Sequence, residues 1–75
     1  MRKVERFIKG KEYRFNKDFI YDVGYPMLRV ECHAGDYATF DSPNMGMARF
    51  YVRVADTFAL ILVKPREAFK LFEEV

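Results

Sequence analysis

A chain of 75 residues with a formal net charge of +2 has room for one small domain and one hydrophobic core. Apolar residues make up 51% of it and aromatic residues 17%, while the lone Cys32 excludes an intramolecular disulfide and argues against structural zinc. The longest apolar run, residues 58–63, is too short to span a membrane, and no signal peptide is apparent. We therefore expect a cytoplasmic protein.

The first seventeen residues are the most basic part of the chain, with seven lysines and arginines against two acidic residues. Residues 1–10 are thus a basic N-terminal segment on a mildly acidic body. Val4, Phe7 and Ile8 have helical spacing ahead of Gly10, which predicts one or two helical turns. A strand that begins at Phe7 is the alternative.

Alternation of polar and apolar residues predicts short antiparallel strands across residues 11–63. The segments KEYRFN (11–16) and DFIYDV (18–23) both alternate in this way. Residues 28–33 and 37–41 flank a glycine-containing turn, so they are predicted to pair as a hairpin.

Three further segments complete the pattern. DSPNMGM (41–47) is the strongest loop signal in the chain. ARFYVRV (48–54) alternates cleanly, whereas FALILV (58–63) does not alternate at all. A continuous apolar run predicts a strand that is covered on both faces.

Residues 65–75 are predicted to form one helix that covers one face of FALILV. Pro65 suits the first turn of a helix, where its missing N–H has no intrahelical partner. Four apolar residues share one helical face: Ala68, Leu71, Phe72 and Val75. Three charged residues are expected to face water: Lys70, Glu73 and Glu74.

Together these elements predict a mainly β, α+β fold in one domain, residues 1–75. It has about five or six short antiparallel strands and one C-terminal helix packed on them. The strands either roll into a small SH3-like or OB-like barrel or remain an open meander sheet. Cover on both faces of FALILV favours the barrel.

No motif for catalysis, cofactor binding or metal binding emerges, so an enzyme is not expected. Cys32 and His33 are adjacent on a predicted strand, where neighbouring side chains point to opposite faces. Asp36 and Asp41 are five residues apart and diverge for the same reason. The four isolated glycines make no phosphate-binding loop.

Apolar residues at exposed positions favour a protein-binding role. Met45 and Met47 lie in the predicted loop, Tyr25 lies at a turn, and Tyr51 lies on the polar face of its strand. The alternative is that these loops cover an open end of the core. We predict a non-enzymatic protein-interaction module, a regulator or inhibitor, that binds an unidentified protein and self-associates as a dimer. Neither a membrane nor a small-molecule substrate is expected.

A nucleic-acid-binding small β-barrel is the second hypothesis. It would combine the basic N-terminal segment with the outward row of ARFYVRV, because cations and aromatic rings together bind single strands. Its contact residues would be Arg2, Lys3, Arg6, Lys9, Arg49, Tyr51 and Arg53. The acidic balance of residues 18–75 argues against it.

Overall fold

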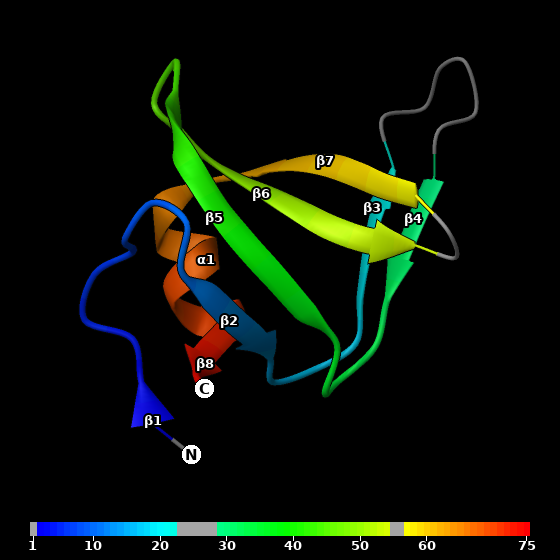
Figure 1. The fold of residues 1–75 in the computed structure, drawn as a ribbon, viewed down its shortest axis with the longest axis horizontal. Coiled ribbons are helices and arrows are strands. Elements are labelled where there is room, and N and C mark those ends of the chain that lie inside the picture. Colours follow the sequence, from blue (N-terminus) through cyan, green and yellow to red (C-terminus); the bar gives the residue numbers. More distant parts are fainter. Residues whose placement is uncertain (1, 23–28, 55–56) are drawn as a thin grey trace.

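The computed structural model describes residues 2–22, 29–54 and 57–75 (Figure 1). In chain order the elements are β1 (Arg2–Lys3), β2 (Glu12–Phe15), β3 (Phe19–Asp22), β4 (Arg29–Cys32), β5 (Tyr37–Asn44), β6 (Met47–Val54), β7 (Thr57–Val63), α1 (Pro65–Leu71) and β8 (Phe72–Glu74). The larger antiparallel sheet has the strand order β1-β8-β2-β5-β6-β7, and β3 pairs with β4 in a second sheet. The predicted mainly β architecture with one helix is confirmed.

The larger sheet is open, so the predicted small barrel is wrong and the open-sheet alternative is right. Closure would require β1 to pair with β7, but these strands occupy opposite edges of the sheet. The sheet is not a simple meander either, because β8, from the end of the chain, lies between β1 and β2.

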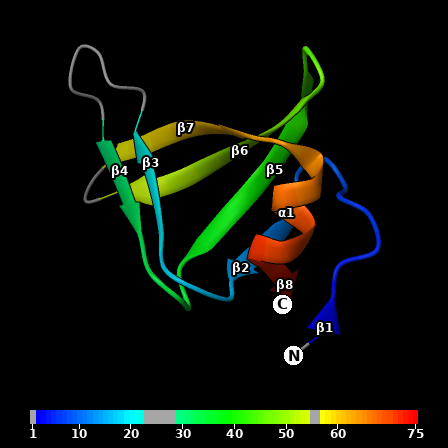
Figure 2. The same ribbon diagram turned by 180° about the vertical axis from the view of Figure 1, so that it is seen from behind.

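One face of the larger sheet is covered by α1 and by the β3–β4 pair, which both lie on the viewer's side in Figure 2. Alternate residues of the sheet point to this covered face and meet buried residues of α1 and β4 there. The core comprises Val4, Tyr13, Phe15, Val30, Cys32, Ala38, Phe40, Ala48, Phe50, Val52, Ile61, Val63, Ala68, Leu71 and Phe72.

Phe7 brings the N-terminal segment into this core. Its ring lies 4.8–6.0 Å, between centroids, from five other rings: Tyr13, Phe40, Phe50, Phe69 and Phe72. The Tyr13 hydroxyl accepts a hydrogen bond from the Ile8 N–H at 2.8 Å, which fixes the path of the chain. Residues 4–8 are therefore neither helix nor strand. Both predictions for this segment are wrong.

The turn at residues 33–36 does not make the predicted hairpin, because the residues that follow it hydrogen-bond to β2 instead of β4. The Gly35 N–H donates to the Phe15 carbonyl at 2.9 Å, and the Phe15 N–H donates to the Asp36 carbonyl at 2.8 Å. Gly35 adopts a φ of 97°, which glycine tolerates. As a result β5 pairs with β2 and β6, while β4 pairs with β3.

Most of the predicted loop at residues 41–47 belongs to strands, and only a two-residue turn remains. β5 and β6 remain paired as far as Asn44 opposite Met47. Between them Met45 and Gly46 have φ values of 53° and 80°, as a type I′ hairpin turn requires.

The helix ends at Leu71, so its predicted extension to Val75 is wrong. The extended β8 places the Phe72 ring 4.5 Å from that of Phe15 and turns Glu73 to the opposite face. There Arg14 donates to one Glu73 carboxylate oxygen from Nε at 2.9 Å and from Nη2 at 2.6 Å. Glu73 is buried instead of facing water. The strand thus brings Phe72 into the core and Glu73 to Arg14.

Candidate functional site

The face of the larger sheet that lies opposite α1 carries exposed apolar side chains. In Figure 1 this face is toward the viewer. Tyr37 is 45% exposed, Tyr51 41%, Phe58 67% and Leu60 40%. We call these four residues the outer patch.

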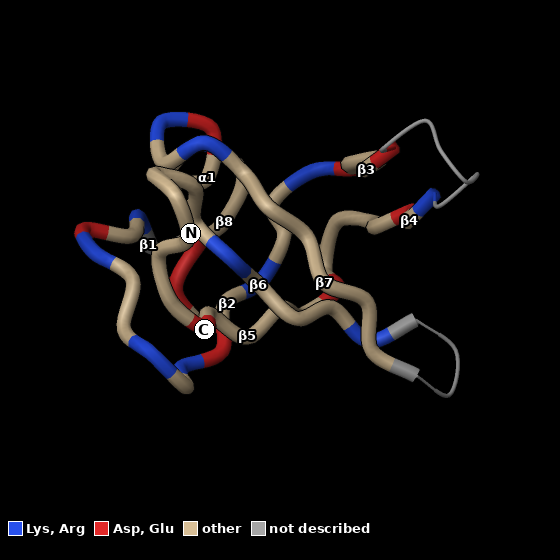
Figure 3. The backbone as a smooth tube through the Cα atoms, turned by 90° about the horizontal axis from the view of Figure 1, so that it is seen from above, with Lys and Arg blue, Asp and Glu red and all other residues tan. Residues whose placement is uncertain are grey.

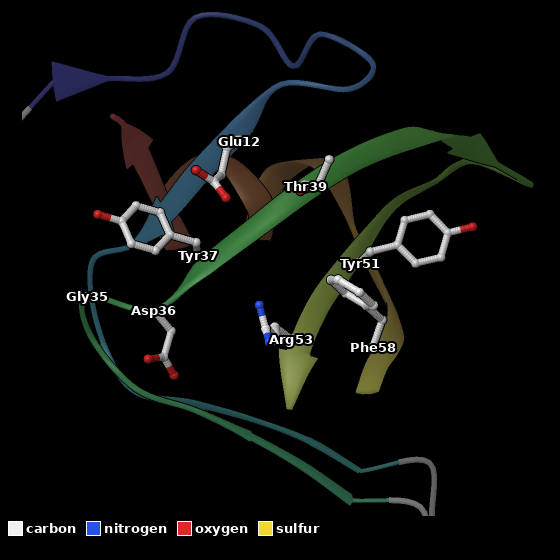
Figure 4. A pocket seen from close by; sticks show the side chains of 8 residues that line it. All are labelled: Glu12, Gly35, Asp36, Tyr37, Thr39, Tyr51, Arg53 and Phe58. Carbon is white, nitrogen blue, oxygen red and sulfur yellow. The ribbon is translucent and has the colours of Figure 1, made fainter. Parts of the chain in front are cut away.

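The strand register places the outer patch on adjacent strands. Tyr51 of β6 is opposite Leu60 of β7, and Arg53 is opposite Phe58. Residues in such opposite positions share a face, with Cβ atoms about 4.5–5.5 Å apart. Tyr37 lies on the same side of β5. The patch therefore spans three strands, with Arg53 between Tyr37 and Phe58 (Figure 4), and ends at β7, the edge of the sheet.

The prediction that FALILV is covered on both faces is wrong. Ile61 and Val63 are buried against the core, while Phe58 and Leu60 on the other face are exposed. The physical reason is that α1 and the β3–β4 pair lie on the same side of the sheet (Figure 2). Within the described residues no element covers the second side.

A hollow of about 620 Å³ opens on the outer face. It is lined by Glu12, Gly35, Asp36, Tyr37, Thr39, Tyr51, Arg53 and Phe58. Figure 4 shows the Arg53 side chain near its centre, with Phe58 on one side and Asp36 and Tyr37 on the other. In the part of the chain that the structure describes, no carboxylate forms an ion pair with Arg53.

Arg49, by contrast, is bound to a partner on the same face. Its Nε donates to Asp41 Oδ2 at 2.7 Å, and its Nη2 forms an ion pair with the same oxygen. The hydrogen bond from Arg49 lowers the pKa of the Asp41 carboxyl, and hydrogen bonding by Ser42 adds to this shift. Arg49 is therefore less available for a ligand than Arg53.

The predicted nucleic-acid residues do not form one surface. Tyr51 and Arg53 lie together on the outer face, whereas Lys3 lies in β1 at the far edge of the sheet and Arg6 follows it in the N-terminal segment. Lys9 lies beside β5, where its charge helps to lower the pKa of the Asp41 carboxyl. The acidic residues of β8 separate β1 from β2 there (Figure 3). Arg2 also lies in β1, and its side chain is not described. Lys11 is paired with Glu74 at 2.5 Å.

The predicted protein-contact residues are also dispersed. Tyr51 lies in the outer patch, whereas Met45 is 96% exposed at the β5–β6 turn. Met47 is half-buried and lines a separate hollow of about 300 Å³ with Phe69 of α1. Tyr25 lies outside the described residues. The sequence interpretation missed Tyr37, Phe58 and Leu60, although the unbroken apolar run contained the signal for two of them.

Cys32 and His33 diverge as predicted. The Cys32 thiol is buried in the core, and this burial, together with the Asp36 charge, raises its pKa to about 11. His33 is exposed, with Nδ1 3.9 Å from Asp18 Oδ1. A neutral, buried thiol is a poor nucleophile. Across residues 2–22, 29–54 and 57–75, no group of three or more His, Cys, Asp or Glu side chains could hold a metal ion.

Two further findings bear on function. No helix among the described residues has the length and apolar character needed to cross a membrane. No protein-family model, no curated protein and no solved structure matches this chain.

Proposed function

We propose that this chain is a small non-enzymatic protein-interaction module that binds a protein partner through the outer patch. The observation that carries the proposal is the exposure of Tyr37, Tyr51, Phe58 and Leu60 on one sheet face. Burying apolar surface is worth about 25 cal/mol per Å². Exposed aromatic side chains grouped in this way are typical of the centre of a protein interface.

The charges around the outer patch favour a selective contact. Arg53 lies in the hollow beside aromatic rings, and Tyr and Arg are enriched among the residues that dominate binding energy. Glu12 and Asp36 at the rim add negative charge. A partner would need apolar side chains for the patch and an acidic group for Arg53. As a regulator or inhibitor, the module would act by covering a surface of that partner.

Phe58→Asp tests this proposal. Affinity capture from a lysate of the source cells, quantified by mass spectrometry, compares the wild type with the variant and with Ile8→Asp. Ile8 is also exposed, at 45%, but lies outside the patch. Loss of one dominant residue costs about 2 kcal/mol or more, which is roughly a thirtyfold loss of affinity.

The proposal therefore expects partners to be lost with Phe58→Asp and retained with Ile8→Asp. Circular dichroism checks that both variants remain folded. Retention of every partner by a folded Phe58→Asp variant would refute the outer patch as the binding surface.

Nucleic-acid binding is the second candidate. It is favoured by one observation, the position of Arg53 directly opposite Phe58 and two residues from Tyr51 on the outer sheet face. Bases stack on such rings, and a cation beside them attracts the backbone. Fluorescence anisotropy with short RNA and DNA tests it. Binding should weaken steeply with salt, and Arg53→Ala should reduce the salt slope by about one. An absence of binding at low salt excludes this candidate.

A further inference from the structure

The free edge of β7 lacks the features that keep sheet edges from pairing. β7 pairs with β6 along its whole length, and no other strand of the described chain joins its second edge. Every second residue of such a strand turns its N–H and C=O groups away from its partner. Natural edge strands are protected by charge, proline or short length. β7 has seven residues with neither charge nor proline, whereas β1 at the opposite edge consists of Arg2 and Lys3 alone.

We propose that β7 pairs antiparallel with β7 of a second copy of this chain, which joins the two larger sheets into one continuous sheet. The inference goes beyond the proposed function, because the second copy pairs with the edge of β7 and leaves Tyr37, Tyr51 and Arg53 of the outer face exposed for another partner. Two-fold symmetry allows one register that pairs all seven residues, with Leu60 on the axis. Phe58 then faces Leu62 of the second copy, so each apolar residue of the outer face meets another.

Charge does not oppose this arrangement. The nearest arginines of the outer face, Arg49 and Arg53, lie on β6, one strand in from the edge. In the dimer the two β6 strands are three strand spacings apart, about 14 Å. This exceeds the Debye length of about 8 Å at physiological ionic strength. The contacts between copies are therefore apolar side chains and backbone hydrogen bonds.

The size of the contact sets its strength. A fully buried phenylalanine removes about 150–250 Å² from water, and Phe58 is 67% exposed. Leu60 is less exposed, at 40%, so one strand pair with three outward apolar residues on each side buries at most about 1,000 Å² in total, below the usual 1,200–2,000 Å² of stable complexes. The dimer should dissociate on dilution.

Sedimentation velocity of the full chain, from about 5 μM to about 1 mM, is the primary test of so small an interface. The wild type should shift from monomer to dimer across this range. Leu60→Lys places two like charges on the axis and should raise the dissociation constant at least about tenfold. The matched control is Ile20→Lys on β3, which is 53% exposed and should leave dimerisation unchanged. A urea midpoint for each variant verifies the fold.

A cross-link tests the register. Leu60→Cys should form a disulfide-linked dimer on mild oxidation, because the two introduced thiols lie opposite each other on the axis. Ile20→Cys should not. Cys32 is buried and does not interfere.

Three results would overturn the dimer: a monomer at every concentration, a dimer that Leu60→Lys leaves intact, or equal cross-linking of both cysteine variants. A monomeric wild type whose partners are still lost with Phe58→Asp refutes the dimer alone. A β7-paired dimer whose captured partners survive Phe58→Asp instead refutes binding of those partners by the patch.

Discussion

The two faces of the larger sheet carry similar side chains but bury them to very different extents. On the covered face, Phe7 closes a cluster of six aromatic rings. On the outer face, Phe58 is 67% exposed, and Tyr51 and Leu60 beside it are about 40% exposed. The difference arises because the N-terminal segment, α1 and the β3–β4 pair all lie on one side. The covered face forms the core, and the outer face is the surface that we propose for binding.

Phe7 and Phe58 make the sharpest test of that contrast. Phe7→Ala should lower the free energy of unfolding by about 3 kcal/mol, near the low end for phenylalanine because its ring is partly buried. Phe58→Ala should change it by less than about 0.5 kcal/mol, as surface substitutions do. Urea denaturation of the monomer at low concentration measures both. Similar losses for the two variants would show that the outer face also contributes to the fold.

Cys32 provides a second comparison between the faces. Its pKa in the folded chain is about 11 because burial disfavours the thiolate, whereas an exposed thiol titrates near 8.5. The folded pKa lies above the unfolded one, so the contribution of this thiol to stability is complete below about pH 8.5 and is lost as the pH rises toward 11. The urea midpoint should fall across that range, and less steeply in Cys32→Ala.

The rate of alkylation gives the same contrast at neutral pH. Iodoacetamide should modify native Cys32 far more slowly than the thiol introduced by Phe58→Cys on the outer face. Comparable rates would mean that the Cys32 thiol is accessible to the reagent in the folded chain.

Several strands could be predicted from the sequence because their signals are local. The alternation of ARFYVRV correctly places Phe50 and Val52 in the core and Tyr51 outside. β8 could not be predicted, because the apolar spacing of Ala68, Leu71 and Phe72 fits a helix equally well. What selects a strand there is pairing with β2, which is remote in sequence.

The candidate site was harder to predict than the fold. Tyr51 was identified because it stands out on a polar strand face. Phe58 and Leu60 belong to an apolar run, and such a run does not reveal whether the chain itself covers its second face. Met47 was predicted to be a contact residue because loops are usually exposed. In the folded chain it is half-buried and lines a hollow together with Phe69.

Arg49 and Arg53 provide the smallest predicted effects. The pKa of Asp41 is lowered by its bond to Arg49, so this pair stabilises the fold above about pH 4, the unfolded value, and its contribution is lost as the pH falls below that. Arg49→Gln should reduce the acid dependence of the urea midpoint slightly. Arg53→Gln should leave that dependence unchanged and weaken partner binding. If Arg53→Gln instead reduced the acid dependence and Arg49→Gln weakened partner binding, the roles assigned to the two arginines would be wrong.

Amide hydrogen exchange measured by NMR at low and at high protein concentration tests the role of the free edge most directly. Pairing of β7 with a second copy protects the backbone N–H groups that point away from β6. We predict that exchange of alternate β7 amides slows as concentration rises, while exchange in β1 stays constant. Exchange of the β7 amides that is independent of concentration, or protection that develops at β1 instead, would contradict a β7 interface.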